Sequence, residues 1–107
     1  MEKMNVNEII NQALDAAKRS LGNKLPYTMD YVERTIKQLG MEMADVETER
    51  ALGQMDDQTA RLIIDTEINA VRTVEITGEG VAKVETEKAI NAALDAVMKA
   101  INKVLGL

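Results

Sequence analysis

The sequence predicts a mainly α-helical domain, a four-helix bundle-like fold with a short β-hairpin between the third and fourth helices. Four segments carry apolar residues at the three- and four-residue intervals of one helical face. One stretch between them instead alternates apolar and polar residues around a Gly-Glu-Gly tripeptide. The chain has 107 residues, of which 46% are hydrophobic and 29% charged. These proportions predict one folded domain over residues 1–107.

The first segment predicts a helix that ends at Leu21. Asn5 can cap its start, and Glu8 lies three residues further on, in the spacing of a capping box. Gly22 stands where helices commonly end in a left-handed conformation. The apolar stripe of this helix comprises Val6, Ile9, Ile10, Ala13, Leu14, Ala17 and Leu21.

The second segment predicts a long helix over about residues 28–52, with Thr28 as its N-cap. Its apolar residues follow the alternating three- and four-residue spacing of a heptad seam. The next two seam positions are Arg50 and Gly53, so we expect the seam to end there. Gly40 lies in mid-helix at a cost of about 1 kcal/mol relative to alanine. The seam comprises Met29, Val32, Ile36, Leu39, Met43 and Val46.

A second apolar face begins after Gly40 on the same helix. At about 37 Å, this helix would exceed the first helix, at about 25 Å, and its distal end would protrude from a small bundle. The distal half also carries the acidic excess, because residues 42–57 hold six acids and one base in a chain of net charge −5. The second face comprises Met41, Ala44, Thr48, Ala51 and Met55.

The third segment predicts a helix over about residues 57–71, which Asp56 or Asp57 can cap. Glu67 falls on the same face as its apolar residues. That stripe comprises Ala60, Ile63, Ile64, Ile68 and Val71.

The predicted hairpin pairs residues 73–77 with residues 81–85 across a three-residue turn at 78–80. In this register Val74 faces Val84 on one side of the ladder. The rival interpretation is two helices that continue around the turn. A helix through residues 81–85 would point Val84 away from the main stripe of the last segment, which favours the hairpin.

The last segment predicts a helix over about residues 86–105, closed by Gly106. Its apolar face is unusually wide, because Ala92, Ala96 and Ala100 extend the stripe of larger residues. An apolar face this broad is usually buried by more than one neighbour.

The composition excludes several function classes. The chain contains no His and no Cys, which removes the commonest general base and the thiolate metal ligands. It has no basic stripe to neutralise phosphates, which argues against nucleic-acid partners and an anionic membrane surface. The first residues lack the apolar stretch of a signal peptide, so we expect none, and the sequence contains no apolar run of about 18 residues. We expect a cytoplasmic, non-enzymatic protein without a cofactor.

Two alternatives remain beside a protein-interaction module. The first is a ferritin-like carboxylate metal-binding protein, in which Glu42, Glu49 and Glu67 would supply oxygen ligands. The absence of His disfavours it, and Glu67 could instead pair with Arg50 across two helices. The second is a carrier that holds a small apolar ligand under the last helix.

The distal half of the second helix predicts a docking surface. Methionine is adaptable and common at partner-binding surfaces, and tyrosine is enriched at interfaces. We therefore expect a homo-oligomer, most simply a two-fold dimer, with another protein partner as the alternative. The predicted contact residues are Tyr31, Met41, Ala44, Thr48, Ala51 and Met55.

Overall fold

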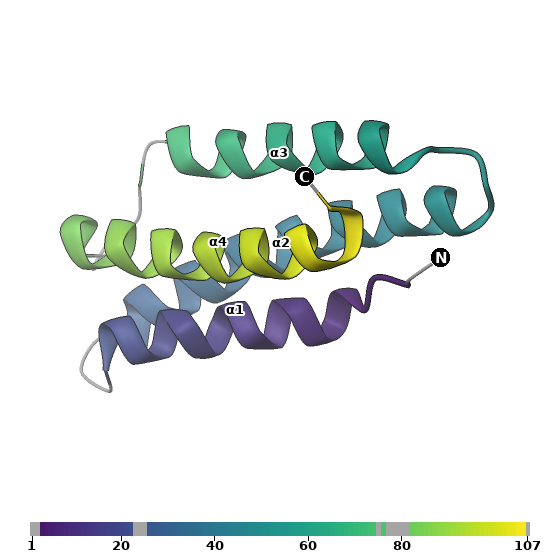
Figure 1. The fold of residues 1–107 in the computed structure, drawn as a ribbon. Helices are drawn as coiled ribbons and strands as arrows, with labels where there is room; N and C mark the ends of the chain where they lie inside the picture. Colours follow the sequence, from purple (N-terminus) through teal and green to yellow (C-terminus); the bar gives the residue numbers. More distant parts are fainter. Residues whose placement is uncertain (1–2, 23–25, 75, 77–81, 107) are drawn as a thin grey trace.

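The computed structural model describes residues 3–22, 26–74, 76 and 82–106 of the chain. Within these residues the chain forms four helices: α1 (Val6–Leu21), α2 (Pro26–Ala51), α3 (Asp57–Thr73) and α4 (Lys83–Leu105). Successive helices run in opposite directions, and the α2–α3 turn lies at the same end of the bundle as both termini (Figure 1). The mainly α, bundle-like class that the sequence predicts is confirmed.

Helices α2 and α4 form the centre of the packing, because each contacts the three other helices, whereas α1 and α3 do not approach each other closely within the described residues. The pairing of α4 with α1 is the most extensive single contact, because fully buried alanines on both helices let the two backbones approach. The broad apolar face expected for the last helix is therefore covered by several neighbours. These alanines are Ala13, Ala17, Ala89 and Ala93.

Three of the expected helix ends are confirmed. The Asn5 side chain accepts a hydrogen bond from the backbone N–H of Glu8 at 3.1 Å. Asp56 likewise caps α3, and its Oδ1 accepts from the N–H of Thr59 at 2.7 Å. Gly22 follows α1 with a φ of 70°, a conformation that favours glycine. Side-chain capping thus fixes where α1 and α3 begin.

The expected role of Thr28 is wrong. Helix α2 begins at Pro26, where the fixed φ of proline suits a first helical position and its missing N–H costs nothing. Thr28 is instead buried inside the first turn. Its hydroxyl oxygen accepts the N–H of Ala82 at 3.2 Å, which ties the start of α2 to the start of α4.

The predicted β-hairpin is also wrong. The described residues contain no strand: Thr73 ends α3, and Lys83–Glu85 form the first turn of α4. Val84 is 60% exposed there, so a valine that points away from the main stripe simply faces solvent. Residue 75 and residues 77–81, which include the expected turn, lie outside the described residues.

The heptad seam of α2 is confirmed and runs further than expected. Its residues from Val32 to Val46 are buried, and Met29 packs partly buried against them. The seam does not end before Arg50, which is itself only 2% exposed. Its last position therefore holds a buried guanidinium group. Gly53, with a φ of 76°, then lies in the turn that leads to α3.

The end of α2 and the start of α3 extend beyond the adjacent ends of α1 and α4 (Figure 1). Helix α2 has 26 residues, against 16 in α1 and 23 in α4. The long second helix therefore protrudes as its length predicts. Even so, no described helix is both long and apolar enough to cross a membrane.

Gly40 has a packing role that explains its place in mid-helix. A Cβ atom at this position would lie 2.8 Å from Cγ1 of Ile10. Such a distance is a steric conflict, so the glycine is what lets α1 pack closely on α2. The local loss of helix propensity is offset by this contact between the two helices.

We predict that Gly40→Ala destabilises the protein. The gain in helix propensity is about 1 kcal/mol, whereas overpacking in a well-packed core costs about 1–3 kcal/mol. In an Ile10→Ala background the conflicting carbon is absent, and the same change should become stabilising. Chemical denaturation of the four proteins measures both effects. A stabilising effect of Gly40→Ala in both backgrounds would refute the packing role.

Candidate functional site

Four of the six predicted contact residues form one exposed strip on α2, here called the α2 ridge: Met41, Ala44, Thr48 and Ala51. The side chain of Met41 is one of the most exposed large apolar groups, at 69%. The hydroxyl of Thr48 donates to the carbonyl of Ala44 at 3.0 Å, so its polar hydrogen is satisfied within the helix. The ridge is thus apolar and keeps the three- and four-residue spacing of a helix-packing seam.

The other two predicted contact residues lie elsewhere. Tyr31 is half-buried and borders the groove between α2 and α3, on another side of the helix from the α2 ridge. Met55 is half-buried in the α2–α3 turn and packs against the core. The structure therefore does not bring these two residues together with the ridge.

Helix α1 covers only part of the α2 ridge. Met41 and Ala44 border a groove of about 460 Å³ between α1 and α2, together with Val6 and Ile10. Thr48 and Ala51 lie beyond this groove, because α1 begins at Val6 and cannot reach them. The ridge therefore has its least covered half where α2 extends beyond its neighbour.

Unpaired acids lie beside the α2 ridge. Asp45 and Glu49 directly follow Ala44 and Thr48, about 100° further round the helix, and both are exposed. Neither forms an ion pair with another described residue. The surface presented to a partner is thus an apolar strip with a negative margin.

A buried ion network lies under the same end of α2. The Arg50 Nη1 atom donates to both carboxylate oxygens of Glu47, at 3.0 and 2.9 Å. Its Nε atom donates to Asp57 at 2.7 Å, and the N–H of Met4 donates to Glu47 at 3.0 Å. The network therefore joins α2 to the start of α3 and to the segment before α1.

Burial on its own would lower the pKa of Arg50, because the charged form loses its hydration. The hydrogen bonds with Asp57 and Glu47 outweigh this effect and raise the pKa of Arg50 above its ordinary value. The guanidinium therefore stays charged, and it acts as a structural cross-link. The expected pairing of Arg50 with Glu67 is wrong.

The acids of the metal hypothesis are only partly brought together. Glu42 and Glu67 border a groove of about 290 Å³ between α2 and α3, and Glu49 is not among its lining residues. The described residues contain no group of three or more acidic side chains placed to hold a metal ion. Two carboxylates would leave most of the six oxygen positions around Mg²⁺ to water.

The same groove is the nearest match to the carrier hypothesis. Its lining includes Leu39 of α2, Val71 of α3 and Ile90 of α4, so the groove does reach the last helix. Its volume of about 290 Å³ lies at the lower limit of common small-molecule sites.

A feature that the sequence did not reveal is a groove of about 610 Å³ between α1 and α4, here called the α1–α4 groove. Half-buried Ala92, Ala96 and Ala100 of α4 lie along it, with Ala16 of α1 opposite. The four-residue spacing of the α4 alanines was visible in the sequence as a wider apolar face. That α1 lies beside this alanine face could not be predicted, because α1 and α4 are far apart in the chain.

Comparison with known proteins identifies no relative: no family model matches the chain, and neither a curated protein nor a solved structure matches it.

We predict that Arg50→Met lowers the free energy of unfolding by about 3–5 kcal/mol, because Glu47 would remain buried without its counter-charge. Replacing both partners, in Arg50→Met with Glu47→Leu, should cost less than Arg50→Met alone. Urea denaturation of the wild type and the two variants gives both values. If Arg50→Met costs less than about 1 kcal/mol, the network is not a structural cross-link.

We predict a pH-dependent contribution from Asp56. The hydrogen bond from the N–H of Thr59 lowers the pKa of Asp56 below its usual value of 3.8. Its stabilisation is therefore present above about pH 4 and is lost as the pH falls through the folded-state pKa. Asp56→Asn keeps an acceptor but cannot titrate, so it should lose less stability than wild type between about pH 5 and pH 3. Equal losses in the two proteins would contradict this role.

Proposed function

We propose that this chain is a non-enzymatic, homo-oligomeric assembly module that docks through the α2 ridge. One observation carries the proposal: a 26-residue helix buries one heptad seam in its own core and exposes a second one. A second seam has the spacing that knobs-into-holes packing against another helix requires. The proposed partner is another copy of this chain.

The chemistry of the α2 ridge suits a helix–helix contact. Ala44, Ala51 and the methyl group of Thr48 are small, so a second helix can approach closely. Met41 offers a long, adaptable side chain that can fill a gap in the partner surface. Burying its apolar surface contributes about 25 cal/mol per Å² before the cost of association is subtracted.

We predict that the wild type has a mass above 11.8 kDa at micromolar concentration and that Met41→Glu with Thr48→Glu returns it to 11.8 kDa. Two buried, unpaired charges would outweigh the apolar gain. Analytical ultracentrifugation measures the masses, and circular dichroism checks that the helices persist.

The matched control is Leu62→Glu. Leu62 lies on the outward side of α3 and is 66% exposed, close to the 69% of Met41. This variant should keep the mass of the wild type. A monomeric wild type, or a ridge variant that still assembles, would refute the proposed function.

A further inference from the structure

The α1–α4 groove has the shape to receive a helix. Its floor is formed by Ala92, Ala96 and Ala100, which recur every four residues and leave a shallow channel beside Ala16. On the α1 side the groove is bordered by the half-buried Ala16 and by polar side chains such as Gln12, so its apolar surface comes mainly from the α4 alanines. A bulky residue at any of these alanine positions would fill the channel.

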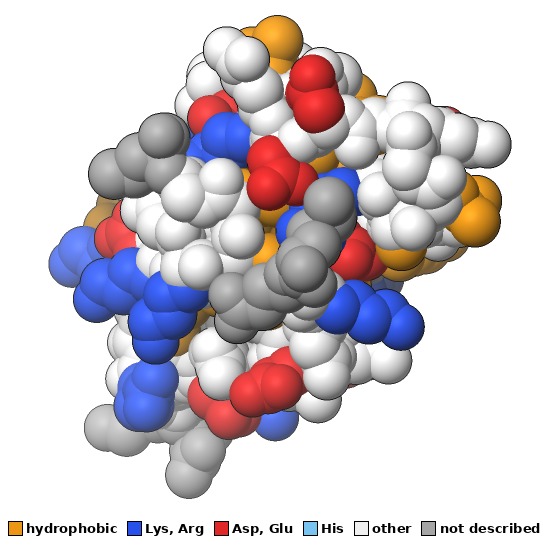
Figure 2. Space-filling view, turned by 45° about the vertical axis from the view of Figure 1, so that its right-hand side comes forward, with side chains coloured by type: hydrophobic (Ala, Val, Ile, Leu, Met, Phe, Trp, Pro, Cys, Tyr) orange, Lys and Arg blue, Asp and Glu red, His pale blue; other side chains and the backbone are white. Residues whose placement is uncertain are grey.

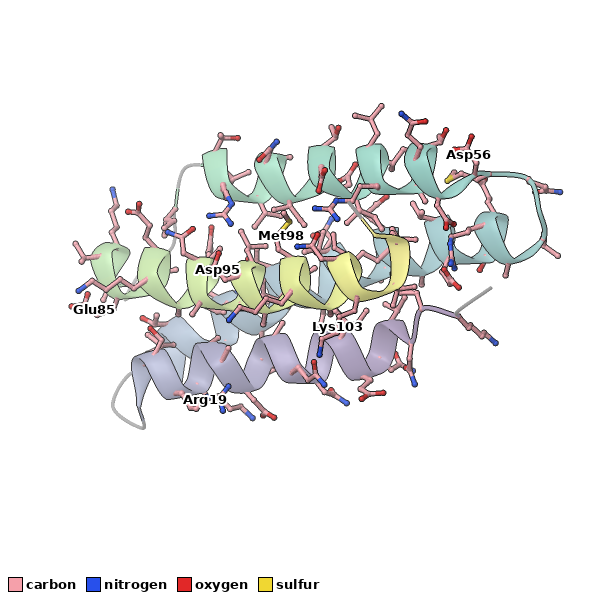
Figure 3. The ribbon with its side chains drawn as sticks, viewed as in Figure 1. Arg19, Asp56, Glu85, Asp95, Met98 and Lys103 are labelled. Carbon is pink, nitrogen blue, oxygen red and sulfur yellow. The ribbon has the colours of Figure 1, made fainter. Side chains whose placement is uncertain are left out.

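The margins of the α1–α4 groove are mainly positive. Arg19, Lys99 and Lys103 line it and are exposed, and none of them forms an ion pair with another described residue. Lys3 lies at one end of the same groove. Figure 3 shows Arg19 and Lys103 toward opposite ends of the channel. In Figure 2, Lys and Arg side chains gather over the side of the bundle formed by α1 and α4.

Two acids also border the α1–α4 groove and reduce its positive charge only in part. Asp95 already pairs with Arg72 of α3, with 3.3 Å between Nη2 and Oδ1. Glu8 lies in the first turn of α1, where the helix dipole favours a negative charge. The cations therefore remain in excess, and their most suitable partner is a helix with an apolar strip and acidic margins.

The α2 ridge matches this requirement in charge and in length. Asp45 and Glu49 on its margin are exposed and lack ion pairs within the described residues. From Met41 to Ala51 the ridge is about 15 Å long, and the stretch of α1 from Glu8 to Arg19 that borders the groove is about 16 Å long. The chain thus carries an apolar strip with acidic margins and an alanine-floored groove with mainly basic margins, of similar length.

We propose that the α2 ridge of one copy lies in the α1–α4 groove of another copy. This inference rests on the proposed function, and it names the surface that receives the ridge. Pairing two ridges about a two-fold axis would bring Asp45 and Glu49 of both copies toward each other, at an electrostatic cost. Pairing ridge with groove brings these acids toward Lys99 and Lys103 instead.

The consequence is a head-to-tail assembly. The ridge and the groove are different surfaces, so each copy offers one of each. Addition then gives a ring where the rotation between copies closes and an open filament where it does not. Because the contact is partly electrostatic at its margin, raising the salt concentration should weaken it.

The test is complementation between two variants. The ridge variant is Met41→Glu with Thr48→Glu, and the groove variant is Lys99→Glu with Lys103→Glu. Each should be monomeric alone, with a dissociation constant for self-association at least about tenfold above that of the wild type. An equimolar mixture should form a 1:1 dimer, because the intact ridge of one variant meets the intact groove of the other.

The matched control carries the same charge change on α4 outside the groove, as Lys83→Glu with Lys88→Glu, and should assemble like the wild type. If the groove variant unfolds, Lys99→Gln with Lys103→Gln replaces it and should weaken assembly less. A wild type that assembles, with a monomeric ridge variant and a groove variant of unchanged affinity, would overturn this inference and leave the proposed function intact. A mixture that yields only monomers would overturn it as well. A monomeric wild type would overturn both this inference and the proposed function.

Discussion

Burial of the α2 seam determines how the rest of the molecule is arranged. The seam from Val32 to Val46 faces the other helices of the bundle, and this sets the rotation of α2 about its axis. Once that rotation is set, Met41 and Thr48 must point away from the core, because they lie on a different face of the same helix. The exposed ridge is therefore a direct consequence of the buried seam.

The ion network extends this constraint past the apolar core. Arg50 occupies the last position of the seam, where a hydrophobic residue could have packed. Hydrogen bonds with Glu47 and Asp57 compensate its charge. Such a network adds little net stability compared with an apolar isostere, but breaking it is costly. It fixes the α2–α3 turn at the end where the ridge is least covered, and so keeps the ridge on a rigid helix.

Much of the fold could be predicted from the sequence because the signals were local. Asn5 and Asp56 cap helices through residues three positions away, and the heptad seam is a property of one segment. The predictions that were wrong concern residues whose local structure depends on a partner far away in the sequence. Thr28 accepts a hydrogen bond from Ala82, 54 residues away, and Val84 lies in a helical first turn whose alternating pattern resembled a strand. The charge of Arg50 suggested the end of the seam, although Glu47 lies three residues before it on the same helix. Its other partner, Asp57, belongs to α3, and only the packing of α3 on α2 brings it to the guanidinium.

The candidate site was partly predictable for the same reason. The α2 ridge is periodic within one helix, so Met41, Ala44, Thr48 and Ala51 could be grouped from their spacing. Met55 continues the same spacing, but α2 ends at Ala51, so the structure places Met55 in the turn against the core. Tyr31 lies off this spacing, and the structure places it beside the groove between α2 and α3. The α1–α4 groove needed the pairing of two helices that no pattern in either segment specifies.

Docking of the ridge in the groove is measured most directly by disulfide trapping between two variants, because the chain contains no native cysteine. Ala44→Cys places a thiol on the ridge, and Ala96→Cys places one in the groove. A disulfide forms only when the two Cα atoms come within about 7 Å. If the ridge lies in the groove, an oxidised mixture yields a cross-linked dimer of the two different variants, identified by mass spectrometry. Cross-links confined to Ala44→Cys chains, or no cross-link at all, would contradict this docking.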